Sequence, residues 1–229
     1  DYASVEKLWR DTAGKVPHNP RALGNVALVL QQRGQLAEAR KLFDRVIKMP
    51  GVEAKMRIDI AHLFAQMGEL DRACDMLGSV IKDLPDDFAE LPSLQYDLAM
   101  MYVKKDDGEA ALKLLRQAAE KTKNDAVITD AMAAILAGMG RVEEALQAYL
   151  RNVSEEPHVA THRIKAAEFL QSQGLPDRAV DLLRKGLAQE ASSPELRLAY
   201  GRALLDAGDP RGAVEEFQEC LKLKIDWGE

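Results

Sequence analysis

The stretch RGQLAEARKLF at residues 33–43 returns along the chain in related forms. The copies are MGELDRACDML at 67–77, MGRVEEALQAY at 139–149, QGLPDRAVDLL at 173–183, AGDPRGAVEEF at 207–217 and a degenerate DDGEAALKLL at 106–115. All but the degenerate copy place a glycine just before a run with apolar residues at helical spacing. The recurrence predicts a fold built by stacking one repeated unit.

The spacing of the repeated glycine fixes the length of the unit. Gly34 and Gly68 are 34 residues apart, as are the last three copies, and the interval from Gly68 to Gly140 is two such repeats plus four residues. With this glycine at position 15, the predicted repeats are 20–53, 54–87, 92–125, 126–159, 160–193 and 194–227. Position 20 is then alanine in all of them: Ala39, Ala73, Ala111, Ala145, Ala179 and Ala213.

Each repeat has the pattern of two amphipathic helices on either side of the glycine. In the first copy, Val26, Ala27 and Leu30 form one apolar stripe, and Ala39 and Phe43 belong to the next. Glycine suits the left-handed residue that ends the first helix, because a Cβ is penalised there. Small residues at positions 8 and 20 predict close approach of the two helix backbones.

A period of 34 residues with these columns resembles the tetratricopeptide repeat (TPR) family. The resemblance implies an all-α fold, a right-handed superhelical α-solenoid of stacked antiparallel helix pairs. We predict a single solenoid over 1–229, in which 1–19 is the second helix of a preceding half-repeat, and hence thirteen helices without a strand. Asp106 replaces the glycine in the third copy, so we expect a reshaped turn there. The four extra residues, within 85–91, predict a longer loop.

Composition and charge restrict the class of partner. The 229 residues are 47% hydrophobic and 30% charged, and the net charge of −6 argues against a surface for nucleic acid or an anionic membrane. No apolar run is long enough to cross a bilayer, so we expect no membrane insertion by these residues. The chain begins with Asp1 rather than Met, which we interpret as a fragment of a longer protein. The compartment stays open: cytoplasmic, or periplasmic if a missing upstream segment tethers the chain.

The sequence contains no recognisable catalytic, metal-binding or cofactor-binding motif. His158 and His162 share a helical spacing near Glu155 and Glu156, but they straddle a repeat boundary without a further ligand. We therefore expect no metal site, no cofactor and no enzymatic activity. The two cysteines lie four repeats apart and predict no disulfide. Of these, Cys220 falls on a core column, whereas Cys74 is expected to be partly exposed.

The TPR resemblance also implies where a partner binds, since first helices line a groove in that family through positions 2, 5, 9, 12 and 13. The carboxylate clamp of TPR co-chaperones is not supported, because Gly24 and Leu28 occupy its places. The asparagine ladder of a TPR glycosyltransferase is missing as well, since Asn25 alone matches it. The predicted groove residues are Arg21, Leu28, Lys55, Ile58, His62, Tyr96, Met100, Lys104, Glu168 and Arg202.

Two functions follow as hypotheses. The first is a protein–protein interaction scaffold that binds a peptide or partner helix in this groove, with an apolar strip of Leu28, Ile58, Tyr96 and Met100. Neighbouring lysines predict a peptide of alternating apolar and acidic residues, and the C-terminal half offers plainer residues. The uncapped ends predict self-association.

The alternative is an accessory TPR domain of a larger membrane-anchored enzyme of glycan or envelope biogenesis. The opening LWRDTAGKVPHNPRA, residues 8–22, is similar to the junction at which bacterial multi-spanning, glycosyltransferase-like membrane proteins pass into an extracytoplasmic TPR tail. Residues upstream of Asp1 would separate the two hypotheses.

Overall fold

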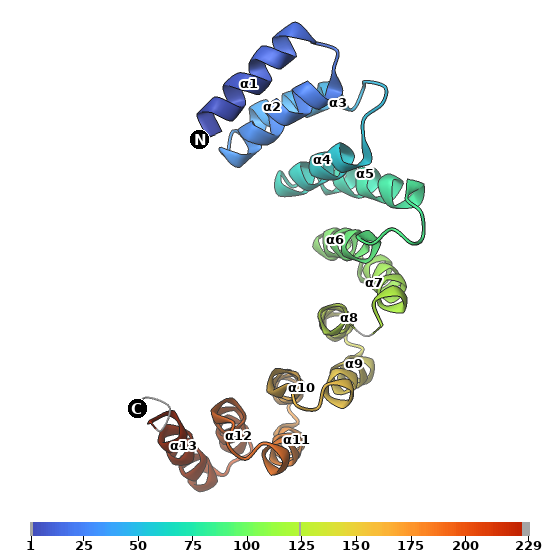
Figure 1. The fold of residues 1–229 in the computed structure, drawn as a ribbon. Coiled ribbons are helices and arrows are strands. Elements are labelled where there is room, and N and C mark those ends of the chain that lie inside the picture. Colours follow the sequence, from blue (N-terminus) through green and yellow to red (C-terminus); the bar gives the residue numbers. More distant parts are fainter. Residues whose placement is uncertain (1, 124, 226–229) are drawn as a thin grey trace. The chain divides into compact units, whose positions relative to one another are not determined.

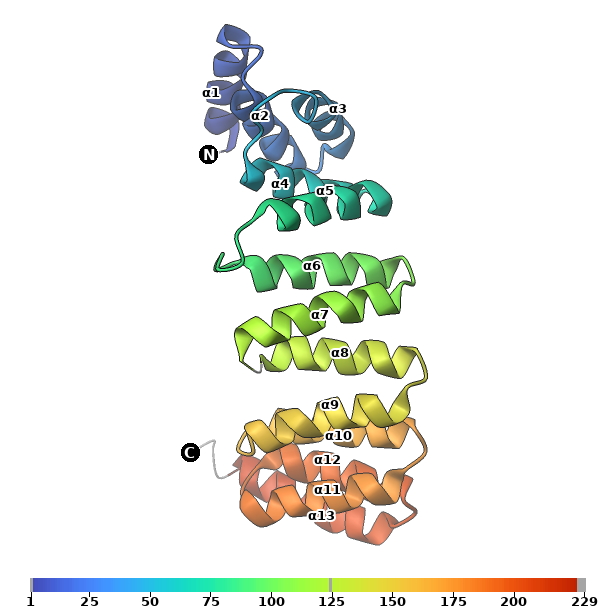
Figure 2. The ribbon, with the colours of Figure 1, turned by 90° about the vertical axis from the view of Figure 1, so that its right-hand side faces the viewer.

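A computed structural model describes residues 2–123 and 125–225, which form thirteen helices and no strand (Figures 1 and 2). The helices are α1 (Tyr2–Lys15), α2 (Pro20–Gln32), α3 (Leu36–Val46), α4 (Ala54–Gln66), α5 (Leu70–Asp83), α6 (Leu91–Lys104), α7 (Gly108–Thr122), α8 (Ala126–Gly138), α9 (Val142–Glu155), α10 (Ala160–Ser172), α11 (Pro176–Gln189), α12 (Pro194–Asp206) and α13 (Pro210–Ile225). The all-α prediction and the helix count are confirmed.

The chain divides into two compact units, unit 1 at residues 1–118 and unit 2 at residues 119–229. In unit 1, α2 packs on α3 and α4 on α5, with α1 against α2 and α5 against α6. In unit 2, α8 packs on α9, α10 on α11 and α12 on α13. Each unit is thus a stack of antiparallel helix pairs, as in an α-solenoid. The assignment of the whole chain to one domain with the repeat bounds above stays a prediction.

The turn inside each repeat is the same at all six places. The residue after position 15 donates its N–H to the carbonyl of position 11, as from Gln35 to Leu30 at 2.9 Å and from Glu69 to Phe64 at 2.8 Å. Glycines at position 15 have positive φ, 75° at Gly34 for example. Asp106 takes the same conformation, with φ 61°, and Asp107 donates to Tyr102 at 2.9 Å. The expectation of a reshaped third turn was wrong, because Asp tolerates the left-handed region better than most residues.

Side-chain caps explain where several helices begin. The Oδ1 of Asn19 accepts from the N–H of Arg21 at 2.9 Å, just before Pro20 opens α2. Asp125 caps α8 and Ser193 caps α12 in the same way. These residues satisfy N–H groups that have no partner inside the helix. Polar caps followed by proline at the first turn therefore set the start of α2 and α12.

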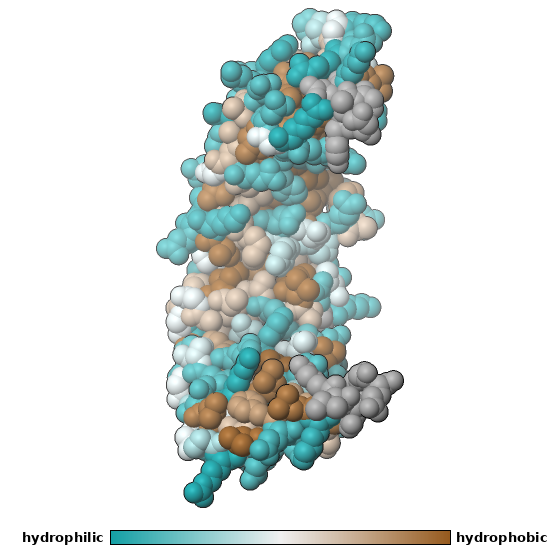
Figure 3. Space-filling view, turned by 90° about the vertical axis from the view of Figure 1, so that its left-hand side faces the viewer, coloured by the Kyte–Doolittle hydropathy of each residue, from teal (hydrophilic) through white to brown (hydrophobic). Residues whose placement is uncertain are grey.

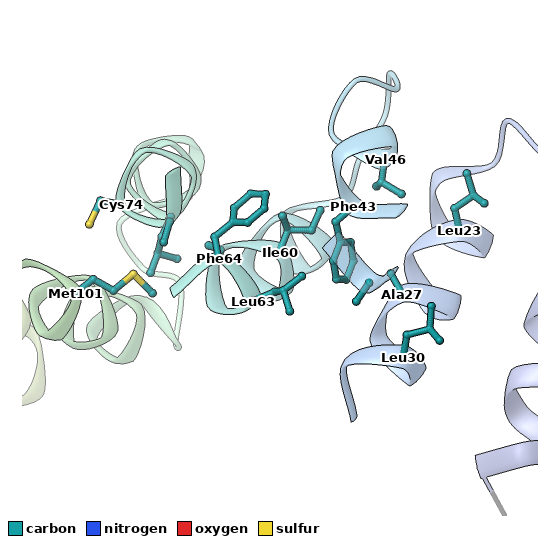
Figure 4. Close-up of a cluster of buried hydrophobic side chains, with 14 of the residues drawn as sticks. Leu23, Ala27, Leu30, Phe43, Val46, Ile60, Leu63, Phe64, Cys74 and Met101 are labelled. Carbon is teal, nitrogen blue, oxygen red and sulfur yellow. The ribbon is translucent and has the colours of Figure 1, made fainter. Parts of the chain in front are cut away.

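The core of unit 1 is a continuous apolar cluster between the helix pairs (Figure 4). Phe43, Ile60, Leu63 and Phe64 are completely buried in it. Each of the six alanines at position 20 is also completely buried, in both units. The alanine column therefore lies where helix backbones approach most closely, and the bulky residues fill the space on either side.

The structure agrees with the expectation for Cys220 and contradicts the expectation for Cys74. Cys220 is buried, and its Sγ donates to the carbonyl of Pro194 at 3.3 Å. Cys74 is buried as well, so the expectation of partial exposure was wrong. It follows Ala73 on α5 and joins the cluster that Leu98 and Met101 of α6 complete. Burial raises the pKa of the Cys74 thiol.

The longer loop between α5 and α6 covers residues 84–90, as the four extra residues predict. Phe88 in this loop packs partly buried against the core of unit 1. Its carbonyl accepts from the N–H of Leu91, where α6 begins. The insertion is therefore anchored to the core by an apolar side chain.

Charged side chains also join α3 to α5 on the surface of unit 1. Arg72 contacts Asp44 at 2.5 Å and Glu69 at 2.7 Å, and Arg40 contacts Glu69 at 2.9 Å and Asp44 at 3.8 Å. The Arg72 guanidinium also lies 3.8 Å from the ring centre of Phe64. Two cations and two anions thus close a ring across the boundary between two repeats.

Candidate partner-binding surface

Within each unit the first helices of the repeats present a surface that we call the first-helix face of that unit: α2, α4 and α6 in unit 1, and α8, α10 and α12 in unit 2. Adjacent helices contact each other here, α2 with α4 and α10 with α12. The space-filling view shows apolar and polar side chains mixed over the visible surface (Figure 3). Since interfaces as a whole are about as apolar as other protein surface, individual residues have to identify a binding site.

Unit 1 presents most of the predicted groove residues on this face. Leu28, Ile58, Tyr96 and Met100 are half-buried on α2, α4 and α6. Lys55 and Lys104 are exposed on α4 and α6. These predicted residues combine accessible apolar surface with positive charge, although the assignment of the site stays a prediction.

Polar pairs connect neighbouring first helices in unit 1. Gln31 on α2 donates its side-chain amide to Gln66 on α4 at 2.8 Å. The predicted groove residue His62 pairs with Asp97 on α6, its Nε2 lying 3.2 Å from Oδ2. These pairs link neighbouring first helices, and the His62 side chain is still 38% exposed.

One carboxyl group on this face, that of Asp59, is less stable in its ionised form than an exposed carboxyl group. Burial raises the pKa of Asp59 on α4, while the positive charges of Lys55 and His62 act in the opposite direction. Burial is the larger effect, because it removes water that would stabilise the charged form.

In unit 2, the groove positions line a small hollow between α10 and α12. Its volume is about 170 Å³. Ile164, Leu198 and Ala199 supply its apolar surface, and the predicted residues Glu168 and Arg202 are exposed at its rim. At its edge, Gln171 donates to Asp206 at 2.5 Å, which ties α10 to α12. The structure therefore brings Glu168 and Arg202 together around one depression.

A polar cluster beside α8 was not found by sequence reasoning. Asn152, buried on α9, donates to Asp130 at 2.7 Å and to the carbonyl of Ala126 at 3.2 Å. Lys165 on α10 pairs with the other oxygen of the same Asp130. The signal was present in the sequence, because Asn152 interrupts a column in which the other repeats carry apolar or small residues.

Arginines at position 4 of two repeats make contacts with the preceding repeat that the sequence analysis missed. Arg163 donates to the carbonyl of Pro157 at 3.3 Å, and Arg197 donates to the carbonyl of Ala191 at 2.8 Å. Both carbonyls belong to position 32 of the preceding repeat. The recurrence of arginine at this position was the available signal for a contact between successive repeats.

The two histidines considered for metal binding differ in how exposed their side chains are. The His162 side chain is 8% exposed, with Nε2 2.8 Å from Glu156, whereas the His158 side chain is 89% exposed. Within the described residues, no three His, Cys, Asp or Glu side chains are grouped so as to hold a metal ion. Every helix in this part of the chain is also too short or too polar to cross a membrane.

Comparison with known proteins places these features in a family. Two family models described as tetratricopeptide repeats match residues 21–49 and 170–222. A solved tetratricopeptide repeat protein from Parabacteroides merdae superimposes with a TM-score of 0.64 at 17% identity, covering 97% of this chain and 87% of that one. These two segments of the chain carry tetratricopeptide repeats.

A second solved structure and a curated relative provide further comparisons. A crystal structure of YrrB, described as a TPR protein with an unusual peptide-binding site, has a TM-score of 0.50 at 17% identity and covers 80% of this chain and 93% of that one. Cellulose synthase 2 operon protein C of Komagataeibacter xylinus is 28% identical over 96% of this chain. The chain spans only 18% of the length of that relative.

Proposed function

We propose that this TPR chain is an interaction scaffold whose first-helix face binds a peptide or a partner helix. The observation that supports it most is the hollow between α10 and α12, where Ile164 and Leu198 form an apolar surface with Glu168 and Arg202 at the rim. An apolar centre with a charged rim is the arrangement that binding surfaces use, because the centre supplies affinity and the rim supplies orientation.

The same arrangement in unit 1 supports a second contact region. Tyr96 and Met100 are half-buried on α6, and Lys55 and Lys104 are exposed on the same face. Aromatic and methionine side chains are frequent anchors in interfaces. The proposed ligand of unit 1 is a segment with alternating apolar and acidic residues. YrrB, whose solved structure is described with a peptide-binding site, provides a precedent on the same fold.

Affinity capture from an extract of the native organism tests the proposal. The unit 1 variant combines Lys55→Glu, Tyr96→Ala and Met100→Ala, and the unit 2 variant combines Leu198→Ala and Arg202→Glu. We expect each variant to lose a partner that the unchanged chain captures, while circular dichroism shows an unaltered helix content.

A matched control places the changes on the second helix of a repeat. Lys113 and Arg116 are exposed on α7, outside the first-helix face. The combination Lys113→Glu and Arg116→Ala should leave every partner bound. Retention of all partners by both face variants would show that binding lies elsewhere.

The second candidate function is an accessory domain of a larger membrane-anchored enzyme of glycan or envelope biogenesis. The relative named for a cellulose synthase operon favours it, because the match covers 96% of this chain and only 18% of that protein. Membrane fractionation of the full-length native protein, followed by assay of the cell's polysaccharide in a deletion strain, tests this candidate. A full-length protein found wholly in the soluble fraction would contradict it.

Self-association forms part of the proposal as well. Val214 on α13 is 52% exposed, although Cys74, Leu112 and Val180 at the same repeat position are buried. Leu221, two turns further along, is 61% exposed. We expect sedimentation to detect dimers that the double change Val214→Glu and Leu221→Glu abolishes, and a monomer at all concentrations would contradict this part.

A further inference from the structure

A large cleft in unit 1 lies where successive repeats are joined, beside the first turns of α2 and α4. Its volume is about 720 Å³, and it runs between the turn that joins α1 to α2 and the turn that joins α3 to α4. The hollow in unit 2 has about 170 Å³. Pockets of about 300–1,000 Å³ are typical of sites that enclose small molecules, so this cleft has room for a large side chain and the backbone on either side of it.

The walls of the cleft are apolar and stiff. Three prolines line the cleft at or beside the two turns: Pro17, Pro20 and Pro50. Its half-buried lining residues are Pro20, Val52 and Met56. Because proline fixes its own φ, these turns lose little conformational freedom when a ligand binds. The Met56 side chain also reaches Gly24, where an added Cβ would lie only 2.4 Å from its sulfur. The absence of a side chain at Gly24 thus lets Met56 lie across α2.

The rim of the cleft carries three polar side chains. His18 and Arg21 lie on the α1–α2 side, and Glu53 lies on the other side. All three are exposed, and in the described part of the chain none of them takes part in an ion pair. By contrast, Arg57, one turn into α4, is paired with Asp83 at 2.9 Å. Lys48 and Lys55, which lie near Glu53 along the chain, are exposed as well.

We propose that this cleft binds an extended peptide segment of a protein partner, with an aromatic side chain against the proline-lined walls and an adjacent acidic residue at Arg21. Most of the lining residues are exposed, so the cleft is open along its length and fits a chain that passes across it. The aromatic ring matches the apolar walls, and the carboxylate matches the unpaired guanidinium. This site lies at the edge of the first-helix face of unit 1, and it includes Arg21, which was predicted from the sequence to belong to the groove.

Methyl-labelled NMR of the whole chain tests the cleft with a defined probe, the blocked peptide acetyl-Gly-Ser-Asp-Phe-Asp-Ser-Gly-amide. The Met56 methyl resonance should shift on titration. A peptide with Ala in place of Phe, and one with Lys in place of both Asp residues, should each bind about tenfold more weakly. Equal binding of the Lys peptide would overturn the assignment of Arg21.

Two variants locate the interaction. Val16→Trp places a ring on the exposed rim and should abolish the Met56 shift, and Arg21→Glu should reverse the preference so that the Lys peptide binds more tightly. Lys41→Glu, an exposed charge reversal on α3, is the matched control and should change nothing. Shifts at Met100 instead of Met56 would overturn the cleft and support the first-helix face. An unperturbed Met56 methyl at saturating peptide would overturn the proposal as well.

Discussion

The turn glycines allow a sharp test of why the repeats keep their geometry. Gly68 has φ 77°, and an added Cβ would have no atom within 4 Å. A change to alanine therefore meets no clash, and its whole effect comes from the backbone. The left-handed conformation costs an L-residue about 1–2 kcal/mol, while the stiffer unfolded chain returns about 0.4–1 kcal/mol. We expect Gly68→Ala to destabilise the α4–α5 pair by about 1 kcal/mol.

The third repeat supplies the matched control. Asp106 already has a Cβ and already occupies the left-handed region. Asp106→Ala should therefore cost less than half as much as Gly68→Ala, because only the greater tolerance of Asp for this conformation is lost. Gly68→Asn should lie between the wild type and Gly68→Ala.

Native-state hydrogen exchange is the suitable assay, since a chain of two compact units need not unfold in one step. Opening free energies of the α4 and α5 amides should fall by about 1 kcal/mol in Gly68→Ala. Unchanged exchange in Gly68→Ala, or an equal loss in Asp106→Ala, would refute the reasoning that the left-handed residue limits the choice at position 15.

Three further predictions address packing, charge and access. Ala145 is completely buried, so Ala145→Leu should overpack α9 and cost about 1–3 kcal/mol in urea unfolding; an unchanged midpoint would mean that the site expands freely. The raised pKa of Asp59 means that its ionised form costs stability, a cost that appears as the pH rises through that pKa and is absent below the ordinary Asp pKa. Asp59→Asn should therefore stabilise unit 1 at neutral pH and lose this advantage in acid, and a gain that persists at low pH would contradict burial as the cause. Cys74 is buried and its thiol pKa is raised, so iodoacetamide should label it far more slowly in the native chain than in urea; equal rates would be incompatible with its place in the core.

Repetition is the reason that so much of the fold could be predicted. A small residue at position 20 is completely buried in every repeat, so six copies of Ala in one sequence carry the information that an alignment usually provides. The helix starts were readable for a related reason, since Asn19 and Ser193 each stand before a proline. Local rules and a repeated environment together fixed the helices.

The failures concern residues whose environment is set by a single contact. Cys74 was expected to be partly exposed, because its partners Leu98 and Met101 belong to the next repeat, beyond the four-residue insertion. The turn at Asp106 was misjudged, because the hydrogen bond from Asp107 to Tyr102 depends on backbone conformation rather than on the presence of glycine. The surroundings of Cys74 do not repeat along the chain in the same form, whereas the hydrogen bond of the Asp106 turn recurs at all six turns.

The candidate sites were harder to predict than the helices for a geometric reason. The cleft in unit 1 is formed by two turns about thirty residues apart, and each turn by itself looks like an ordinary loop. The pairing of His62 with Asp97 depends on the distance between α4 and α6, which the pattern of one helix does not contain. Sequence periodicity identifies which face a residue occupies, but not what the neighbouring element places opposite it.

The side chains that differ between the repeats bear on the kind of partner that the chain can bind. Position 20 never changes within this chain, whereas position 9 on the first-helix face is different in every repeat: Leu28, His62, Met100, Ala134, Glu168 and Arg202. A ligand with one repeated chemical unit would be matched by one repeated set of contacts. Because each repeat instead offers a different side chain at the same place, the surface favours a partner whose own residues change along its length. A protein or peptide segment has that property, and a uniform polymer lacks it.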